Sequence, residues 1–346
     1  MARIVIAGGG SVGACIAYHL ALLGARDVVL ADRAEIASGS TGKAMGGVRQ
    51  QFSTAAEVEL ARESIAFFEE LGSSWFQQVG YLFLATTPEG LAELEARREL
   101  QQELGVPVEP VDARFVAGLN ADDVLGAVFC ATDGVADPPA LTREIIRRSV
   151  ELGVDVLEHT DARELERDVL VIAAGPHSGE FGVDLPVRPL VRQLLETESV
   201  PDLPEDLPMV IEAETGFHFR RRDDCLRIAM SDAEARWGFE ETVDESVFED
   251  RLERLAHRYP HAAGIGIARA WAGLYDMTPD AHPIIGPVGD GNYAACGFSG
   301  HGFMQSPAVG RAVAEELLRG ESTFDLGPYR LERFAGGTTF REELVL

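Results

Sequence analysis

Residues 3–32 read RIVIAGGGSVGACIAYHLALLGARDVVLAD, and their pattern predicts the fold of the N-terminal region. The apolar run 3–7 predicts a buried strand, and the glycine cluster after it predicts a turn. Residues 14–21 have the composition of a helix, and residues 27–31 form a second apolar run with the composition of a strand. This order of elements is typical of a strand–helix–strand unit in an α/β fold.

The glycines of this turn have a spacing that carries chemistry. Gly8, Gly10 and Gly13 match GxGxxG, whose glycines allow a tight turn, the approach of a pyrophosphate and close packing of helix on strand. Asp32 ends the second strand 19 residues beyond Gly13, where a dinucleotide fold places the carboxylate that binds a ribose, and Arg33 follows it. The segment predicts dinucleotide binding; the alternative is an ordinary strand–helix–strand unit with a glycine-rich turn.

The next segment favours one dinucleotide over another. Residues 37–52 read ASGSTGKAMGGVRQQF and are dominated by small and hydroxyl side chains. A nicotinamide enzyme normally continues into helix after the acidic strand, whereas this stretch could wrap a pyrophosphate and then a flat ring. The alternative is a flexible surface loop, which glycine and serine also suit.

With these motifs in place, the chain resembles the FAD-dependent amine and amino-acid oxidoreductases of the D-amino-acid oxidase, glycine oxidase and sarcosine oxidase group. It is most similar to sarcosine oxidase β-subunits and L-proline dehydrogenase β-subunits. The resemblance covers nearly the whole length. It rests on motifs in this order: residues 8–13 with 32–33, residues 40–49, residues 172–175, residues 275–286 and residues 297–304.

The resemblance implies a fold and a domain division. The fold class is α/β (α+β overall): an FAD-binding, Rossmann-like three-layer domain with a second domain built on an antiparallel sheet, which has helices on its far side. The FAD-binding domain would be discontinuous, and the two blocks between its parts would form the substrate or cap domain. The expected segments are 1–78, 137–184 and 276–335 for FAD; 79–136 and 185–275 for the cap; and 336–346 for a tail.

The motifs and the resemblance together imply a set of FAD contacts. The cofactor should be bound noncovalently, because monomeric sarcosine oxidases tether flavin through a cysteine where this chain has Gly273. The expected cofactor-binding residues are Gly8, Gly10, Ser11, Val12, Gly13, Asp32, Arg33, Ser40, Thr41, Lys43, Ala44, Met45, Gly46, Gly47, Ala162, Ala174, Gly175, Gly297, Gly300, His301, Gly302, Phe303 and Met304.

The resemblance also implies candidate catalytic residues. Related oxidases hold the substrate carboxylate with a lysine where this chain has Met304, so Arg49 becomes the leading carboxylate contact, although the equivalent arginine often lies over the flavin. His218 and Phe219 match the strand that supplies an aromatic hydroxyl, and the alternative for His218 is a core histidine. Tyr275 stands beside a motif near the flavin. The candidate catalytic residues are therefore Arg49, Tyr275, His301, Met304, His218 and Phe219.

Two further side-chain assignments follow. His301 either contacts flavin or braces its glycine-rich turn. Residues 220–222 are three arginines, and two aspartates follow them at 223–224. This pattern predicts a solvated turn in which the charges compensate one another locally.

The implied reaction is oxidation of a small amino acid or secondary amine to the imine, with hydride transfer to flavin N5. Lys43 is the only lysine, and it lies in the phosphate-side segment. A dehydrogenase that passes electrons to a second subunit or a quinone is therefore favoured over an oxidase, unless Arg227 supplies positive charge near the ring. The alternatives are a non-autonomous electron-transfer subunit of a heteromeric dehydrogenase and an FAD-dependent 2-hydroxy-acid dehydrogenase.

Composition limits the partners. The 346 residues carry a formal net charge of −27, which disfavours nucleic acid and anionic membranes, and such an acidic chain suits either a halophilic cytoplasm or an arginine-biased genome. Cys15, Cys130, Cys225 and Cys296 form no metal or disulfide motif, so no metal site is expected and the thiols should be buried. No apolar run reaches the length of a membrane span, and a cytoplasmic location is expected.

Overall fold

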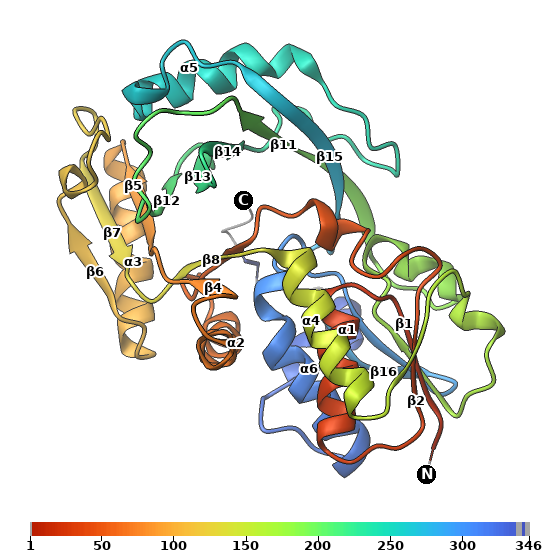
Figure 1. Ribbon diagram of the computed structural model, residues 1–346. Coiled ribbons are helices and arrows are strands. Elements are labelled where there is room, and N and C mark those ends of the chain that lie inside the picture. The colour runs from red at the N-terminus through yellow and green to blue at the C-terminus, as the bar shows by residue number, and fades with distance from the viewer. Residues whose placement is uncertain (1, 337–340, 343–346) are drawn as a thin grey trace.

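Two lobes make up the molecule in this computed structural model, one above the other in Figure 1. The structure describes residues 2–336 and 341–342. Most of the expected tail, 336–346, therefore lies outside the described residues.

The lower lobe is built on a six-stranded sheet with the order β16-β17-β10-β1-β2-β9. Its strands are parallel except for the antiparallel pair β16-β17. The inner strands are continuous apolar runs because helices and loops cover both faces. The strands are β1 (Ile4–Ala7), β2 (Val28–Ala31), β9 (Asp155–Leu157), β10 (Val169–Ile172), β16 (Ile284–Gly289) and β17 (Asn292–Cys296).

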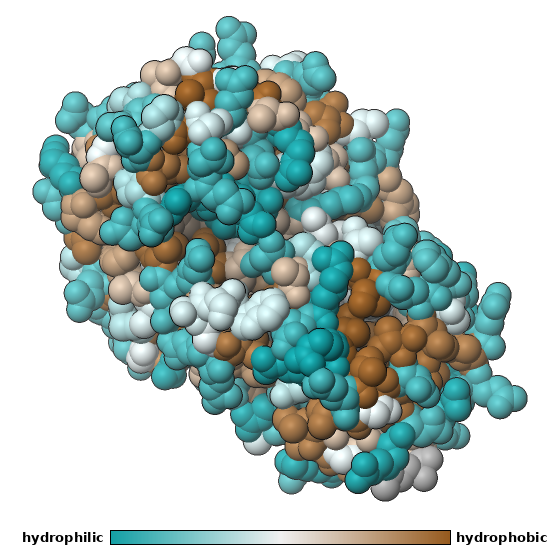
Figure 2. Space-filling view, in the orientation of Figure 1, coloured by the Kyte–Doolittle hydropathy of each residue, from teal (hydrophilic) through white to brown (hydrophobic). Residues whose placement is uncertain are grey.

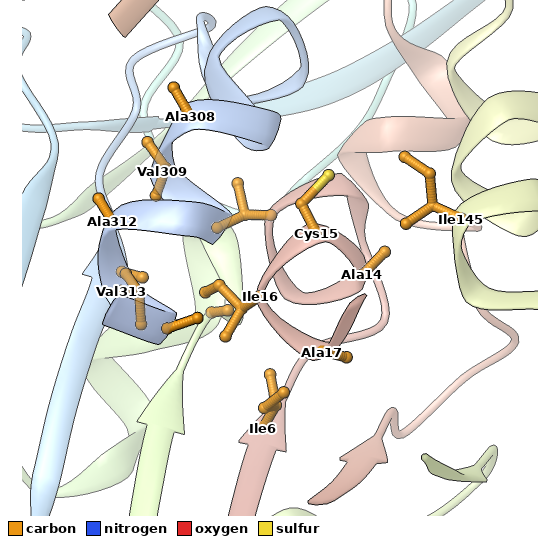
Figure 3. Packing of buried hydrophobic residues seen from close by; sticks show 14 of the residues in the cluster. Ile6, Ala14, Cys15, Ile16, Ala17, Ile145, Ala308, Val309, Ala312 and Val313 are labelled. Carbon is orange, nitrogen blue, oxygen red and sulfur yellow. The ribbon is translucent and has the colours of Figure 1, made fainter. Parts of the chain in front are cut away.

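Four helices belong to this half of the molecule: α1 (Ser11–Leu22), α2 (Ala55–Leu71), α4 (Pro138–Glu151) and α6 (Gly302–Arg319). Helices α1 and α6 pack closely side by side, and branched side chains such as Ile16, Val309 and Val313 belong to the cluster that fills this region (Figure 3). Helix α6 includes the last residues of the motif at 297–304. It begins at Gly302, so its N-terminus directly follows the glycine-rich turn.

The upper lobe is built on an eight-stranded sheet with the order β15-β11-β14-β13-β12-β5-β7-β6. The pair β12-β5 is parallel, which is a difference from the antiparallel sheet that we expected, because a long crossover joins the two cap blocks. The strands are β5 (Tyr81–Ala85), β6 (Val108–Val111), β7 (Gly126–Cys130), β11 (Arg188–Thr197), β12 (Met209–Glu212), β13 (His218–Arg222), β14 (Cys225–Ala229) and β15 (Ile267–Met277).

Two helices cover opposite faces of this second sheet. Leu255 of α5 (Phe248–Arg258) packs in the same cluster as Phe219, on the face turned away from the lower lobe. Leu94 of α3 (Pro88–Glu103) packs with Tyr81 and Phe83 on the other face. The expectation that helices lie only on the far side is therefore wrong for α3.

A short three-stranded sheet, β3-β8-β4, joins the lobes. Its strands are β3 (Gly47–Val48), β4 (Phe76–Gln77) and β8 (Gly134–Ala136). The domain boundaries given above stay a prediction.

The three arginines expected in a solvated turn lie instead in strand β13, and the turn is formed by the two aspartates after them. Arg220 is only 3% exposed, and its Nε donates to the Met45 carbonyl at 2.8 Å. Arg222 pairs with Asp137 at 2.7 Å. The local charges predicted that these arginines are exposed to solvent. The pairing of β13 with both neighbouring strands instead brings Arg220 and Arg222 against the lower lobe.

The thiols and the surface complete the description. Cys15, Cys130 and Cys296 are buried and Cys225 is half-buried, and all four are free. Hydrophilic side chains cover much of the face seen in Figure 2, with a hydrophobic area on the lobe that carries α1 and α4. Among the described helices, none combines the length and apolar character that crossing a membrane requires.

Candidate functional site

One long cavity runs between the lobes and brings together nearly all the predicted site residues, from segments far apart in the chain. Only three predicted residues do not line it. The predicted residues that line the cavity are Gly8, Gly10, Ser11, Val12, Asp32, Arg33, Ser40, Thr41, Lys43, Ala44, Met45, Gly46, Gly47, Arg49, Ala162, Ala174, Gly175, His218, Tyr275, Gly300, His301, Gly302, Phe303 and Met304.

The three exceptions have separate reasons. A Cβ on Gly13 would lie 1.9 Å from the Gly8 carbonyl oxygen, so Gly13 serves the close packing of helix on strand. Gly297 begins the second glycine-rich turn, and its N–H donates to Asp276 Oδ2 at 2.8 Å. Phe219 is corrected: it is buried on the opposite face of the cap sheet with Phe217. Side chains alternate along a strand, so His218 and its neighbour cannot both face the cavity.

The dinucleotide end of the cavity has the geometry that its motif predicts. Asp32 stands at the end of β2, where its carboxylate accepts hydrogen bonds from Gly9 N at 2.6 Å and Ala34 N at 2.8 Å. A Cβ on Gly8 would lie 2.3 Å from the Ala173 carbonyl oxygen. Only glycine therefore fits where the parallel neighbours β1 and β10 end side by side. Gly10, the N-cap of α1, has no side chain to cap the helix, which leaves room for a phosphate.

The segment after Asp32 is held as a wall of the cavity. It forms the 3₁₀ turn η1 (Ser40–Lys43). Ser40 Oγ donates to the Leu274 carbonyl at 2.7 Å, and Trp271 Nε1 donates to the Lys43 carbonyl at 3.0 Å. Lys43 also pairs with Glu241. These bonds tie the segment to strand β15, as a wrapping role requires and a loose surface loop would not.

Glycine is also required where this segment enters β3. A Cβ on Gly47 would lie 1.6 Å from the hydroxyl oxygen of Tyr81, which lines the same cavity. The backbone therefore approaches the cap sheet as closely as glycine allows.

A second glycine-rich turn, 297–302, leads from β17 into α6 and meets the cavity. Asp276 organises it, because its carboxylate accepts the Gly297 N–H and its carbonyl accepts the Ser299 N–H at 3.2 Å. Burial raises the pKa of Asp276 to about 6. A Cβ on Gly300 would lie 2.5 Å from the Tyr275 ring, so ring and turn are in close contact. The N-terminus of α6, with its positive dipole end, therefore faces the cavity.

Arg49 is almost completely buried, with 1% of its surface exposed. Its guanidinium lies over the Phe52 ring, with Cζ 4.1 Å from the centroid, and it donates to the Gln51 carbonyl. Its Nη2 also donates to His301 Nε2 at 3.3 Å. Burial lowers the pKa of this guanidinium, which nevertheless stays a cation at neutral pH.

The strands of the cap sheet form one side of the cavity, its roof, which carries Arg192, His218 and Tyr275. His218 is a neutral side chain in this roof. Its Nδ1 lies 2.8 Å from the Gly216 carbonyl oxygen, and because a carbonyl only accepts, Nδ1 carries the proton. Burial lowers the pKa of His218 to about 4. Its Nε2 is therefore an acceptor. Burial also raises the pKa of Tyr275, which keeps its hydroxyl protonated.

Four lining residues that we did not single out matter to the site: Tyr81, Arg192, Met209 and Asp276. Tyr81, Arg192 and Met209 come from cap strands whose partners are distant in sequence, so no local pattern marks them. Asp276 directly follows the predicted residue Tyr275, and this position next to a predicted residue was the one available signal.

Two glycine-rich strand-to-helix turns facing one long cavity, with an acidic residue at the ribose position, define an FAD-binding oxidoreductase. The chain belongs to the DAO family of FAD dependent oxidoreductases, whose family model matches residues 3–316.

Known proteins are similar to this chain in sequence, and a solved structure is similar to it in fold. The chain is 26% identical to the mitochondrial sarcosine dehydrogenase of Mus musculus over 96% of its own length. It is 29% identical to FAD-dependent oxidoreductase domain-containing protein 1 of Bos taurus, covering 99% of this chain and 87% of that protein. The crystal structure of L-proline dehydrogenase from P. horikoshii matches with a TM-score of 0.90 and 28% identity, over 98% of this chain and 99% of that chain. The chain spans 41% of the length of the sarcosine dehydrogenase.

Proposed function

We propose that this chain oxidises a small amino acid or secondary amine, of the sarcosine, proline or glycine class, to the imine. Its family and the names of its relatives support this class of substrate. When bound, FAD supplies the hydride acceptor at flavin N5. The observation that carries the proposal is the roof of the cavity, where a neutral His218 and a protonated Tyr275 lie among cationic side chains.

The roof residues suit an amine with a carboxylate. His218 Nε2 can accept a hydrogen bond from the substrate amine, because Nδ1 is engaged with the Gly216 carbonyl. Arg49 and the N-terminus of α6 give the floor of the cavity a positive potential, which stabilises negative charge that develops during oxidation. Orientation and electrostatics are thus the contribution of this chain.

The proposed FAD contacts are the lining residues named above, with Asp32 at the ribose and the N-terminus of α1 at the pyrophosphate. We propose noncovalent binding, because Gly273 has no side chain to form a tether and Lys43 packs against it. We propose the division into FAD and cap segments given in the sequence analysis, with boundaries within a few residues of the strand ends.

We propose a dehydrogenase rather than an oxidase. Lys43 is engaged with Glu241, and Arg227 pairs with Glu196 at 2.8 Å and does not line the cavity. Neither cation is placed to activate oxygen. The reduced protein should therefore reoxidise slowly in air and quickly with a soluble quinone, as stopped-flow absorption would measure. Rapid reoxidation by air alone would contradict this acceptor assignment.

The reaction is tested by an absorption spectrum of the purified protein, followed by anaerobic additions of sarcosine, L-proline, glycine and D-alanine. We expect flavin absorption at about 450 nm that one of these compounds bleaches. A flavin-containing protein that is bleached instead by a 2-hydroxy acid, or by no substrate until a second subunit is added, would refute the proposal and favour those functions.

A further inference from the structure

The cavity is lined by four lysine and arginine side chains, and three of them are engaged. Arg33 and Lys43 are paired with carboxylates, and Arg49 donates to the Gln51 carbonyl. The side chain of the fourth, Arg192, has neither a hydrogen bond nor an ion pair with any residue in the described ranges. Its Nε is buried without a partner. A buried donor of a charged group without a partner is costly, so this guanidinium is a candidate for binding an anion.

Strand register explains why Arg192 faces the cavity. In the antiparallel pair β11-β15, Arg192 lies opposite Gly273, and Leu190 lies opposite Tyr275. Two residues separate these pairs, so Arg192 and Tyr275 share one face of the sheet. The Arg192 guanidinium accordingly lies near the Tyr275 ring, with its Cζ 5.6 Å from the ring centroid.

Charge points in the same direction. Arg192 and Arg49 each lower the pKa of Tyr275 and of His218 through their positive charge, so both cations lie near this part of the cavity. The four carboxylates that line the cavity are engaged elsewhere. Asp276 holds the second glycine-rich turn and Glu241 holds Lys43. Asp32 accepts hydrogen bonds from backbone N–H groups, and Asp161 pairs with Arg163.

We propose that Arg192 binds the carboxylate of the substrate, in a subsite that it forms with the Tyr275 hydroxyl. This inference rests on the proposed function and deepens it. The planar fork of arginine matches a carboxylate with two parallel hydrogen bonds. Arg49 is then a positioning residue: its guanidinium is already committed to Phe52, His301 and the Gln51 carbonyl, and it fixes the floor beneath the substrate.

The test uses a probe that has a carboxylate but nothing to oxidise. Binding of 2-furoate and of its neutral analogue 2-furamide to the FAD-loaded protein is measured by calorimetry. The variant is Arg192→Met, which keeps the length of the side chain but not its charge. The matched control is Arg269→Met, because Arg269 lies on strand β15, has a side chain that is 63% exposed and does not line the cavity.

We expect Arg192→Met to weaken furoate binding by about tenfold or more and to leave furamide binding unchanged. Arg192→Lys should recover part of the affinity, because it restores charge without the fork. Arg269→Met should bind both probes as the unmodified protein does. The flavin content of each variant reports whether it is folded. Equal furoate binding by Arg192→Met and the unmodified protein, or no furoate binding by the latter, would overturn the assignment.

The two proposals fail separately. A protein whose flavin is bleached by sarcosine or L-proline, but whose furoate binding ignores Arg192, refutes the carboxylate assignment alone. A protein that binds furoate through Arg192 but is bleached by none of the four amino acids refutes the proposed reaction alone. When the flavin is reduced by the substrate that bleaches it, Arg192→Met should raise the half-saturating concentration of that substrate much more than it lowers the limiting rate of reduction.

Discussion

At the scale of single residues, the site depends on groups whose protonation burial controls. His218 is neutral because burial lowers its pKa to about 4, whereas an unfolded histidine has a pKa of 6.5. Between pH 6.5 and about pH 4, His218 binds a proton in the unfolded chain but not in the folded chain. The contribution of His218 to stability is therefore complete above pH 6.5 and is lost as the pH falls towards 4.

We expect His218→Gln to reduce this pH dependence. Between pH 7 and pH 5 the unmodified protein should lose about 2 kcal/mol of unfolding free energy through His218, since one pKa unit corresponds to about 1.4 kcal/mol. Urea unfolding at both pH values, for both proteins, measures the difference. Equal losses in the two proteins would show that His218 is not neutral when folded.

Asp32 is the residue on which dinucleotide affinity should depend most. Asp32→Asn keeps an acceptor for Gly9 N but removes the charge at the proposed ribose position. We expect FAD affinity to fall by about tenfold or more, because hydrogen bonds to a charged acceptor are the stronger ones. Titration of the flavin-free protein with FAD, followed by fluorescence, provides the value. Asp27→Asn is the control, since Asp27 lies on the surface near Arg3.

At the scale of elements, the contact between α1 and α6 holds both glycine-rich turns in place, because each helix begins at one of them. The contact is tight: a Cβ on Gly310 would lie 2.5 Å from the backbone carbon of Cys15. Figure 3 shows α1 and α6 side by side, with Ile16 on the side of α1 that is turned towards α6.

Gly310→Ala should therefore force the helices apart. We expect a loss of about 1–3 kcal/mol in unfolding free energy, as for other overpacked cores, together with weaker FAD retention. Urea unfolding measures the first effect, and flavin content after dialysis the second. Gly179→Ala is the matched control, since a Cβ at that position meets nothing within 4 Å. Two variants of equal stability would contradict a close helix contact.

At the scale of the whole molecule, the net charge of −27 makes like-charge repulsion a general destabilising force. Salt screens it, since the Debye length falls from about 10 Å at 0.1 M to about 3 Å at 1 M.

We expect Tm to rise by several degrees as KCl is increased from about 0.1 M to about 2 M, because screening weakens this repulsion. Differential scanning calorimetry measures the shift, and sucrose at equal osmolality controls for exclusion effects. A Tm that does not change with KCl would favour the arginine-biased genome over adaptation to high salt.

The local sequence was enough to predict the structural features that contiguous residues form. The GxGxxG turn, Asp32 and the second glycine-rich turn are short motifs whose geometry their own backbone sets, so their place at the cavity could be predicted. The family resemblance extended this prediction to the fold and the cofactor.

Tertiary structure decided which side chains of the cap sheet face the substrate. Side chains alternate along a strand, so the register between distant segments determines which residues point inward. The register of β11 with β15 turned Arg192 towards Tyr275, and the pairing of β13 turned His218 in and Phe219 out. The same pairing buried Arg220, which local charge had suggested was solvated. Short contiguous motifs were therefore enough to predict the cofactor and its two turns, whereas the proposed substrate subsite depends on the pairing of strands that are distant in sequence.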